Sequence, residues 1–393
     1  MADLSKDTFF KLLDATLDFS IDFVENGTTT RAGSSRDENA SYSIKINDSD
    51  FYRAVLSYGN LGLGEAFMRG GFEMVKGSLE GLIEALLACR LDRKLKRDLA
   101  LALKILPFRT LGLLRSKKSN VQGHYDAGLD LFSSFLDPTL TYSCGYAEQE
   151  TDDLEQLQQN KFERICRKLD LKPGDRLLDI GCGFGGMLLY AASHYSIQGL
   201  GITNSKDHNQ TGNDRIRQAG LAHQVRIEMM DFGQASGSFD KVVSIGMLEH
   251  VPPGEYKNYF KTIHRVLNEN GRGLVHFVGA NATANDHDYF IQKYIFPMSH
   301  QPRLSAITAN LERHGLAILD VENMVRHYGY TASHWLHNFR KNRSGLSRYS
   351  DSFLNMFEYY LACCVAAAKA SDAALYQVLF IKNYMGEIPL RRV

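Results

Sequence analysis

The stretch RLLDIGCGFGG, from Arg176 to Gly186, decides the fold that we expect for this chain. It begins with a short apolar run that ends in a glycine turn, which is typical of a buried parallel strand. The glycines at 181, 183, 185 and 186 let the backbone turn sharply and approach a ligand with no Cβ in the way. A helix is expected to begin near Met187. Strand, glycine turn and helix together predict a nucleotide-binding corner.

Two cofactors fit such a corner. Asp179, at the end of the strand, is typical of S-adenosylmethionine sites, where a carboxylate helps to hold the cationic amino-acid end. Gly181, Gly183 and Gly186 also match the GxGxxG spacing of dinucleotide sites, which further requires an acidic residue about 20 positions later. That region reads QGLGITNS, from Gln198 to Ser205, and has no carboxylate. The sequence therefore favours S-adenosylmethionine over NAD, and a purely structural glycine turn is the remaining alternative.

From Asp175 onward, strand patterns alternate with helix patterns, which predicts an α/β fold with a parallel sheet and helices on both faces. Ligands of such sheets bind at the carboxyl ends of the strands. A late strand is expected to close the sheet after a long helix. The predicted strands are Arg176–Ile180, Gln198–Thr203, Val225–Met230, Lys241–Ile245, Gly273–Val278 and Leu375–Ile381. The predicted helices are Met187–Tyr195, Ser205–Gln218, Glu255–Leu267 and Phe353–Lys369.

At 393 residues the chain exceeds one ordinary domain. We predict an amino-terminal domain over residues 1–105, a basic linker over 106–119 and a catalytic domain over 120–393. In the first region, Phe9–Phe23 has helical apolar spacing, Ser41–Ile46 alternates as a strand does, and Ser78–Cys89 is a leucine-rich helix.

Charge and cysteine content narrow the class of protein. Lys plus Arg equals Asp plus Glu at 45 each, so the net charge gives no indication of nucleic acid. The basic stretch Arg90–Arg97 suits a helix lying on anionic lipid, and a solvated helix is the alternative. Met1–Asp22 carries acidic residues, unlike a signal peptide. The cysteines have no zinc spacing, so we expect no metal and free thiols in the cytoplasm, with the chain at most peripheral to the inner face of the membrane.

Several longer motifs together resemble the cyclopropane fatty acid synthase family. They are GHYDAGLDLFSSFLDPTLTYSCGYAE (Gly123–Glu148), LLDIGCGFGG (Leu177–Gly186), VSIGMLEHV (Val243–Val251), GLVHFVG (Gly273–Gly279), KYIFP (Lys293–Pro297) and RHYGYTASHW (Arg326–Trp335). SYGNLGLGEAFMRGGFE (Ser57–Glu73) is similar to the amino-terminal domain of the bacterial members. The resemblance implies a class I methyltransferase fold, Rossmann-like, with a seven-stranded and mostly parallel sheet, and a smaller α+β amino-terminal domain.

The same resemblance implies an activity. Members transfer a methyl group from S-adenosylmethionine to the double bond of an unsaturated acyl chain in a membrane phospholipid, release S-adenosylhomocysteine and form a cyclopropane ring. It also implies a homodimer. Relatives that stop at a methyl or methylene branch, and small-molecule methyltransferases, stay open as alternatives. A lipid-binding module without catalysis would lack Glu249 or the glycine turn, and both are present.

Matching to the family assigns the cofactor residues. Tyr142 and Ser143 contact the methionine end together with Asp179, while Gly181 and Gly183 line the middle. Thr203 and His208 are placed toward the ribose, and Asp231 and Phe232 toward the adenine. The chain departs from the family pattern twice, with Phe184 in place of Trp and His208 in place of Gln. A helix cap is the alternative for Asp231, and a core aromatic for Phe232.

In the resembling family a bicarbonate ion acts as the base, and the matching positions here are Cys144, Glu249, His276, Val278 and Tyr328. Tyr, Cys and His supply hydrogen-bond donors, Glu accepts, and the backbone N–H of Val278 completes the site. A satisfied core histidine is the alternative for His276. Cys364 matches a position suspected of nucleophilic catalysis, which we doubt because no base pairs with it. The aromatic segment Tyr289–Met298 is expected to line an acyl tunnel or a second core.

Overall fold

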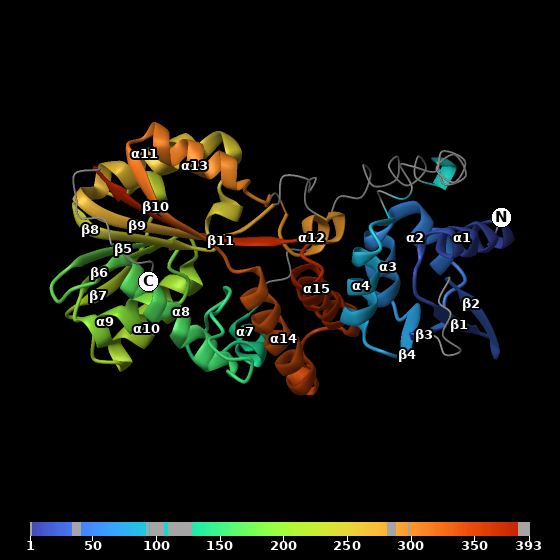
Figure 1. Ribbon diagram of the computed structural model, residues 1–393. Coiled ribbons are helices and arrows are strands. Elements are labelled where there is room, and N and C mark those ends of the chain that lie inside the picture. The colour runs from blue at the N-terminus through green and yellow to red at the C-terminus, as the bar shows by residue number, and fades with distance from the viewer. Residues whose placement is uncertain are drawn as a thin grey trace. The chain divides into compact units, whose positions relative to one another are not determined.

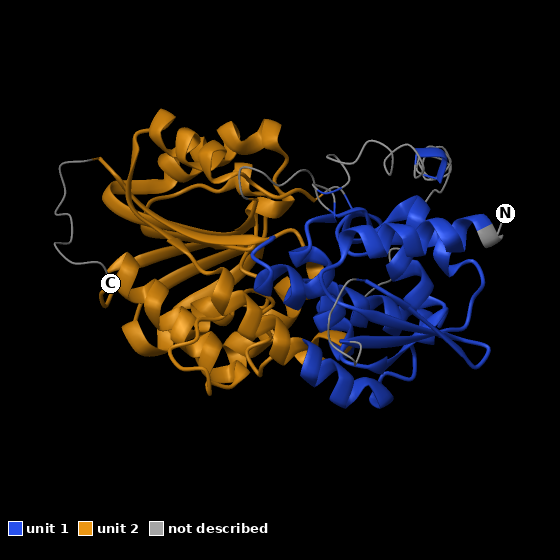
Figure 2. Cartoon of the chain, turned by 45° about the vertical axis from the view of Figure 1, so that its right-hand side comes forward, with its two compact units in different colours: residues 1–130, 287–297, 336–372 blue, residues 131–286, 298–335, 373–393 orange. Residues whose placement is uncertain are grey.

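The computed structural model describes residues 2–33, 41–91, 94, 106–108, 128–280, 288–297 and 299–383. The chain forms two compact units, and neither is continuous in sequence (Figure 2). Unit 1 contains residues 1–130, 287–297 and 336–372, and unit 2 contains residues 131–286, 298–335 and 373–393. The linear division at 105 and 120 stays a prediction, because most of the predicted linker lies outside the described residues.

Unit 2 is built on a seven-stranded sheet of order β10-β11-β9-β8-β5-β6-β7 (Figure 1). The neighbours from β9 to β7 pair in parallel, while β11 is antiparallel to both β9 and β10. This confirms the predicted fold class. The strands are β5 (Arg176–Ile180), β6 (Gln198–Thr203), β7 (Val225–Met229), β8 (Phe239–Ile245), β9 (Leu267–Gly279), β10 (Leu316–Asn323) and β11 (Ala374–Lys382).

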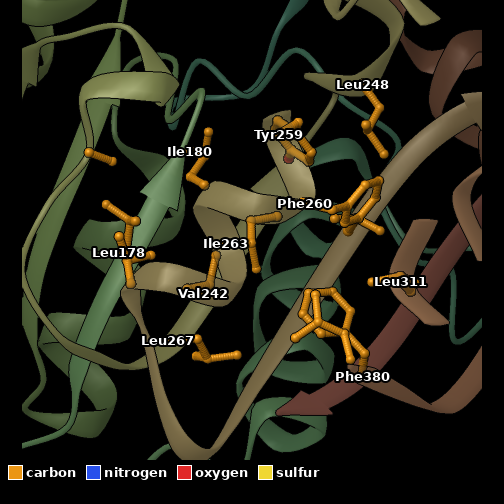
Figure 3. Close-up of a cluster of buried hydrophobic side chains, with 14 of the residues drawn as sticks. Leu178, Ile180, Val242, Leu248, Tyr259, Phe260, Ile263, Leu267, Leu311 and Phe380 are labelled. Atoms are coloured by element: carbon orange, nitrogen blue, oxygen red, sulfur yellow. The ribbon is translucent and has the colours of Figure 1, made fainter. Parts of the chain in front are cut away.

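Helices cover both faces of this sheet because its strands are apolar on both sides. On one face, buried side chains of α8 (Leu154–Leu169), α9 (Gly186–Tyr195) and α10 (Lys206–Gln218) pack against Leu177 and Leu274. On the other face, α11 (Tyr256–Val266) and α13 (Leu304–Arg313) contribute Tyr259, Phe260, Ile263 and Leu311 to a second core cluster (Figure 3). Both clusters position the carboxyl ends of β5, β8 and β9.

The strand β10 was not among the six strands that the sequence pattern places. Its sequence, LAILDVEN, carries Asp320 and Glu322 at positions where an apolar run would continue. A shift of register between Ile318 and Asp320 further breaks the alternation. An edge strand of this kind is recognised by its pairing with β11, which no local pattern reports.

Unit 1 contains a four-stranded sheet of order β2-β1-β3-β4, and mixes helices and strands. Its elements are α1 (Ala2–Thr16), β1 (Ile21–Glu25), β2 (Thr28–Ala32), β3 (Tyr42–Ile46), α2 (Phe51–Tyr58), α3 (Asn60–Met68), β4 (Phe72–Lys76), α4 (Leu79–Ala88), α12 (Tyr289–Tyr294) and α15 (Asp351–Lys369). Two further helices are α7 (Leu129–Phe135) and α14 (Val325–Asn342), and the sequence of each crosses a boundary between the units.

The predicted helix over Phe9–Phe23 is wrong at its carboxyl end. Helix α1 ends at Thr16, and Ile21 and Phe23 lie in β1, where they point to the core in the alternating manner of a strand. Apolar residues at 13, 17, 21 and 23 imitate helical spacing across this boundary. Pairing of β1 with both β2 and β3 overrides it.

Two features of the described residues concern membranes and metals. None of the helices described there combines the length and the apolar character required to span a bilayer. Within the same residues, no group of three or more His, Cys, Asp or Glu side chains is arranged to hold a metal ion.

Candidate active site

The glycine turn after β5 adopts a conformation that requires glycine. Gly181, Gly183 and Gly185 have φ angles of +79°, +53° and +81°, in the region that L side chains rarely adopt. The N–H groups of Gly181 and Cys182 donate to the carbonyl of Ile202 on β6, at 2.9 and 3.2 Å, which ties the turn to the sheet. A Cβ on Gly183 would meet no heavy atom within 4 Å. The turn therefore presents bare backbone beside open space at the carboxyl end of β5.

Asp179, two residues before Gly181, is buried beside an equally buried lysine. Its Oδ1 has no hydrogen-bond partner within the described part of the chain. Burial raises the pKa of Asp179 to about 7, and the charge of Lys161 opposes that rise. Burial lowers the pKa of Lys161 to about 7, against the attraction of Asp137, Cys144 and Asp179. An unpartnered carboxylate oxygen at this depth is suited to a cationic ligand group.

Lys161 was missed by the sequence analysis, although a signal exists. Leu157, Lys161 and Ile165 follow one another at intervals of four on α8, and all three are fully buried. A lysine on the apolar stripe of a helix is unusual and indicates a specific partner. Here Nζ of Lys161 donates to Oγ of Ser143 at 2.9 Å.

The segment before α8 is held by that helix and by aromatic packing. Gln158 of α8 donates through Nε2 to the carbonyl oxygen of Ser143 at 2.8 Å. The ring of Tyr142 packs against Trp335, with centroids 5.1 Å apart, and against two phenylalanines of α7. Tyr142 and Ser143 are thus fixed within unit 2, and their contact with the cofactor stays a prediction.

Thr203 and His208 flank the turn from β6 into α10. Oγ1 of Thr203 accepts a hydrogen bond from the N–H of Ser205 at 3.2 Å. The ring of His208 lies edge-to-face against Phe184, with centroids 4.5 Å apart. Burial lowers the pKa of His208, which favours the neutral imidazole. The two departures from the family pattern therefore pack against each other, and the ribose contact stays a prediction.

After β7, the structure contains both alternatives that the sequence left open. Oδ1 of Asp231 accepts a hydrogen bond from the N–H of Gly233 at 2.8 Å and caps the short 3-10 helix Phe232–Gln234. Phe232 packs edge-to-face on the buried Tyr259, with centroids 5.3 Å apart. These contacts leave one face of Phe232 and the second oxygen of Asp231 compatible with a role toward the adenine. That role stays a prediction.

Glu249 lies in the short 3-10 helix Leu248–His250, immediately after β8. Its Oε1 accepts the backbone N–H of Val278 at 2.6 Å, and its buried Oε2 has no partner among the residues described. Burial raises the pKa of Glu249 to about 7. The sequence predicts that the Val278 N–H donates to a bound anion. In the structure this N–H donates to Glu249, and its donation to an anion stays a prediction.

His276 lies in β9, on the face of the sheet that α8 covers. Its Nδ1 is 3.2 Å from Nε2 of Gln377, and its Nε2 has no partner within the described ranges. Burial lowers the pKa of His276 well below its usual value, with Lys161 and Lys168 adding to the effect. The ring is therefore neutral at physiological pH.

The segment that contains Cys144 is bonded to α14, the helix that carries Tyr328. The N–H of Gly145, next to Cys144, donates to Oγ1 of Thr331 at 3.0 Å, and Thr331 lies one turn after Tyr328. Burial raises the pKa of Cys144 to about 12, so its sulfur carries a proton. The ring of Tyr328 is nearly buried and packs edge-to-face with Trp335. Sγ of Cys144 donates to the carbonyl of Gly145 at 3.1 Å, so the protonated thiol acts as a hydrogen-bond donor rather than a nucleophile.

Cys364 belongs to a different compact unit from the other predicted catalytic residues. It is half-buried in α15 and belongs to unit 1, whereas Cys144, Glu249, His276 and Tyr328 belong to unit 2. Its catalytic role stays a prediction. The aromatic segment around α12 also belongs to unit 1, where Phe290 packs on Tyr359 with centroids 4.7 Å apart. That contact favours a core for part of the segment.

Comparison with known proteins agrees with this geometry. The sequence profile of the mycolic acid cyclopropane synthetase family matches residues 113–378. The chain is 37% identical over 363 residues to the cyclopropane-fatty-acyl-phospholipid synthase of Escherichia coli strain K12, covering 92% of this chain and 93% of that protein. It is 34% identical over 278 residues to a probable fatty acid methyltransferase of Pseudomonas putida, covering 69% and 71% of the two chains.

Solved structures give the same picture. The cyclopropane synthase MmaA2 from Mycobacterium tuberculosis superposes with a TM-score of 0.63 at 25% identity, covering 67% of this chain and all of that one. The mycolic acid cyclopropane synthase CmaA1 complexed with SAH and CTAB superposes with a TM-score of 0.62 at 27% identity, covering 67% and 97%.

Proposed function

The chain belongs to the mycolic acid cyclopropane synthetase family, and we propose that it converts unsaturated acyl chains of membrane phospholipids into cyclopropane chains with S-adenosylmethionine as methyl donor. The observation that carries the proposal is the arrangement at the carboxyl ends of neighbouring strands. A glycine turn follows β5, Glu249 with its buried Oε2 atom follows β8, and a buried His276 lies near the end of β9. The same strand ends bind ligands throughout folds of this type.

The residues around the glycine turn fit S-adenosylmethionine. Bound there, this cofactor supplies an electrophilic sulfonium methyl group, which an alkene requires because it is a poor nucleophile. The unpartnered Oδ1 of Asp179 offers an acceptor to the cationic end of the ligand. The positive φ of Gly183 and the open space beside it allow close approach of the backbone. Burial of Cys144, His276 and Tyr328 excludes water, which would otherwise trap a cationic acyl chain.

The residues around Glu249 fit bicarbonate. Bound there, this ion supplies a base for the proton that the transferred methyl group must lose before the ring closes. The protonated Cys144 and the neutral His276 are donors, as is the hydroxyl of Tyr328. Oε2 of Glu249 is an orphaned, buried acceptor. Three donors and one acceptor of these kinds match an oxyanion that carries one hydroxyl group, and hydrogen bonds to it would offset its desolvation.

Substitution of the donors is expected to separate catalysis from cofactor binding. We expect Tyr328→Phe and Cys144→Ala to lower turnover about tenfold, because each removes one hydrogen bond to the anion, and such bonds to charged groups contribute about 1.5–3 kcal/mol. The affinity for S-adenosylhomocysteine, measured by calorimetry, should stay within about twofold. Equal losses of turnover and of affinity would contradict the assigned roles.

A direct assay tests the activity itself. The protein is incubated with methyl-labelled S-adenosylmethionine and vesicles of unsaturated phospholipid, and the released fatty acids are analysed. Mass spectrometry reports the added carbon, and proton NMR distinguishes a ring from a methyl or methylene branch. The branch is the second candidate, because one relative bears the name probable fatty acid methyltransferase. Labelling of a small polar acceptor, with none in lipid, would overturn the proposal.

Peripheral membrane contact and a homodimer complete the proposal. Lys94 is exposed in the basic stretch, while Arg90 forms an ion pair with Asp372 at 2.6 Å, and the other basic residues of that stretch lie outside the described residues. If its charge binds anionic lipid, vesicle binding weakens as salt is added. Sedimentation with vesicles at low and high salt tests the membrane contact. Light scattering of the free protein tests the homodimer.

A further inference from the structure

A chain of buried polar side chains runs behind His276, on the sheet face that α8 covers. Gln377 of β11 is the direct cross-strand partner of His276 in β9. Nε2 of Gln377 lies 3.2 Å from Nδ1 of His276, and Oε1 of Gln377 accepts a hydrogen bond of 2.7 Å from Nζ of Lys168. All three residues are at most 2% exposed. No step of the proposed reaction uses Lys168 or Gln377.

The donor and acceptor atoms of Lys168, Gln377 and His276 fix the orientation of each hydrogen bond between them. A lysine ammonium group has three donors and no acceptor, so the Gln377 amide must turn its oxygen toward Lys168. The amide nitrogen, which only donates, then faces Nδ1 of His276. Nδ1 must therefore accept, and the proton of the neutral ring lies on Nε2. A flipped amide would place its NH₂ group against the ammonium group, with two donors opposed.

At the other end of this row of side chains, Lys168 is held by carboxylates. Nζ of Lys168 donates to Oε2 of Glu322 at 2.6 Å, and Asp320 lies 3.7 Å away. Arg164 donates to both oxygens of Glu322, at 3.1 and 2.8 Å. Burial lowers the pKa of Lys168, and the two carboxylates oppose that shift. The ion pairs thus favour the charged, donor-only form of Lys168 that the orientation of Gln377 requires.

We propose that Lys168 and Gln377 are positioning residues that hold His276 as the neutral tautomer with its proton on Nε2, and so make it a hydrogen-bond donor to an oxyanion beside Glu249. The Nε2 atom is buried and has no acceptor in the described part of the chain. It belongs to the same strand as Val278, whose N–H is bonded to Glu249. The identity of the anion rests on the proposed function, whereas the tautomer does not.

The tautomer is measured directly by nitrogen NMR on protein labelled with ¹⁵N-histidine. The chain has 13 histidines, and the His276 signals are those that disappear in the variant His276→Asn. In the wild-type protein we expect a protonated, pyrrole-like Nε2 and an unprotonated, pyridine-like Nδ1. In Gln377→Glu, the new carboxylate accepts rather than donates, so we expect the proton on Nδ1. Lys168→Met should leave a mixture, because the amide is free to flip.

A matched control uses another buried lysine of unit 2. Lys241 of β8 donates to the carbonyl of Leu169 at 2.7 Å and does not contact Gln377 or His276 through any hydrogen bond that the described residues show. Lys241→Met should keep the wild-type tautomer. A proton on Nδ1 of wild-type His276, a doubly protonated ring, or an unchanged tautomer in Gln377→Glu overturns the proposal. The wild-type measurement decides the point even if a variant fails to fold.

A kinetic readout separates this inference from the proposed function. Gln377→Glu should raise the bicarbonate concentration for half-maximal activity at least tenfold, because His276 no longer donates, while the KM for S-adenosylmethionine stays within twofold. Unchanged bicarbonate dependence in that variant contradicts the role of the tautomer. Absence of lipid methylation in every protein, with the expected NMR result, refutes the proposed function and leaves the positioning of His276 intact.

Discussion

Replacement of Glu249 by glutamine is expected to lower turnover about a hundredfold or more and to stabilise the folded protein above pH 7. Glutamine keeps an oxygen that can accept the Val278 N–H, which Glu249 binds at 2.6 Å. It replaces the buried acceptor Oε2 by an NH₂ group, which cannot accept the hydroxyl of a bound anion. A well-placed base contributes about 10²- to 10⁴-fold to rate, and the variant misplaces it.

The stability effect depends on pH in a defined direction. The carboxyl of Glu249 titrates at its ordinary pKa of 4.5 when unfolded, and burial raises its pKa to about 7 in the folded state. Between these values the folded state binds more protons, so the free energy of unfolding falls as pH rises. The loss is complete above pH 7 and amounts to about 3 kcal/mol, at about 1.4 kcal/mol per pKa unit. Glutamine does not titrate and avoids this loss.

Urea unfolding of both proteins from pH 4 to pH 8, in buffer free of carbon dioxide, measures the difference. Glu249→Gln should match the wild-type protein near pH 4 and exceed it at pH 8. The exposed Glu255, whose Oε2 accepts from Asn258 at 2.7 Å, provides the control, and Glu255→Gln should change neither turnover nor the pH profile. A stability difference that is constant across pH would show that Glu249 is not the group that titrates.

The parts of the site that the sequence predicts are those with local signals. The run from Arg176 to Gly186 predicts a buried strand, a glycine turn and a helix start near Met187. The structure has the strand, positive φ at three of the four glycines, and a helix that begins at Gly186. Glu249 and His276 were placed by the resemblance, and the structure puts them after β8 and in β9, two strands that pair in parallel. Burial of Glu249, and the raised pKa that follows, agrees with the expectation for a carboxyl in an apolar pocket.

The parts that the sequence did not predict depend on distant pairing. Lys168 and Gln377 are 209 positions apart, and Gln377 and His276 are 101 apart, so no periodicity reports their contacts. Only the buried lysines of α8 leave a trace, as charges on an apolar stripe. The two compact units interleave along the chain for the same reason. Contacts of this kind emerge from the register of β11 against β9, which is set by the whole sheet.

The variant Gly183→Ala is expected to weaken binding of S-adenosylhomocysteine between tenfold and a hundredfold with a small loss of stability. Its φ of +53° is costly for alanine by about 1–2 kcal/mol. In the ligand-free protein the added methyl group meets nothing within 4 Å, so packing adds no further cost. A ligand that lies against the turn must then accommodate this methyl group, and overpacking of that kind costs about 1–3 kcal/mol.

Gly220, after α10, provides a matched control for backbone strain. Its φ is +72°, and a Cβ there also meets nothing within 4 Å. Gly220→Ala should therefore lose a similar free energy of unfolding in urea, while its affinity for S-adenosylhomocysteine, measured by calorimetry, stays at the wild-type value. Because the two substitutions share the same strain, only proximity to the ligand distinguishes them. Equal affinities in both variants would mean that the cofactor, and therefore its reacting methyl group, binds away from the turn between β5 and α9.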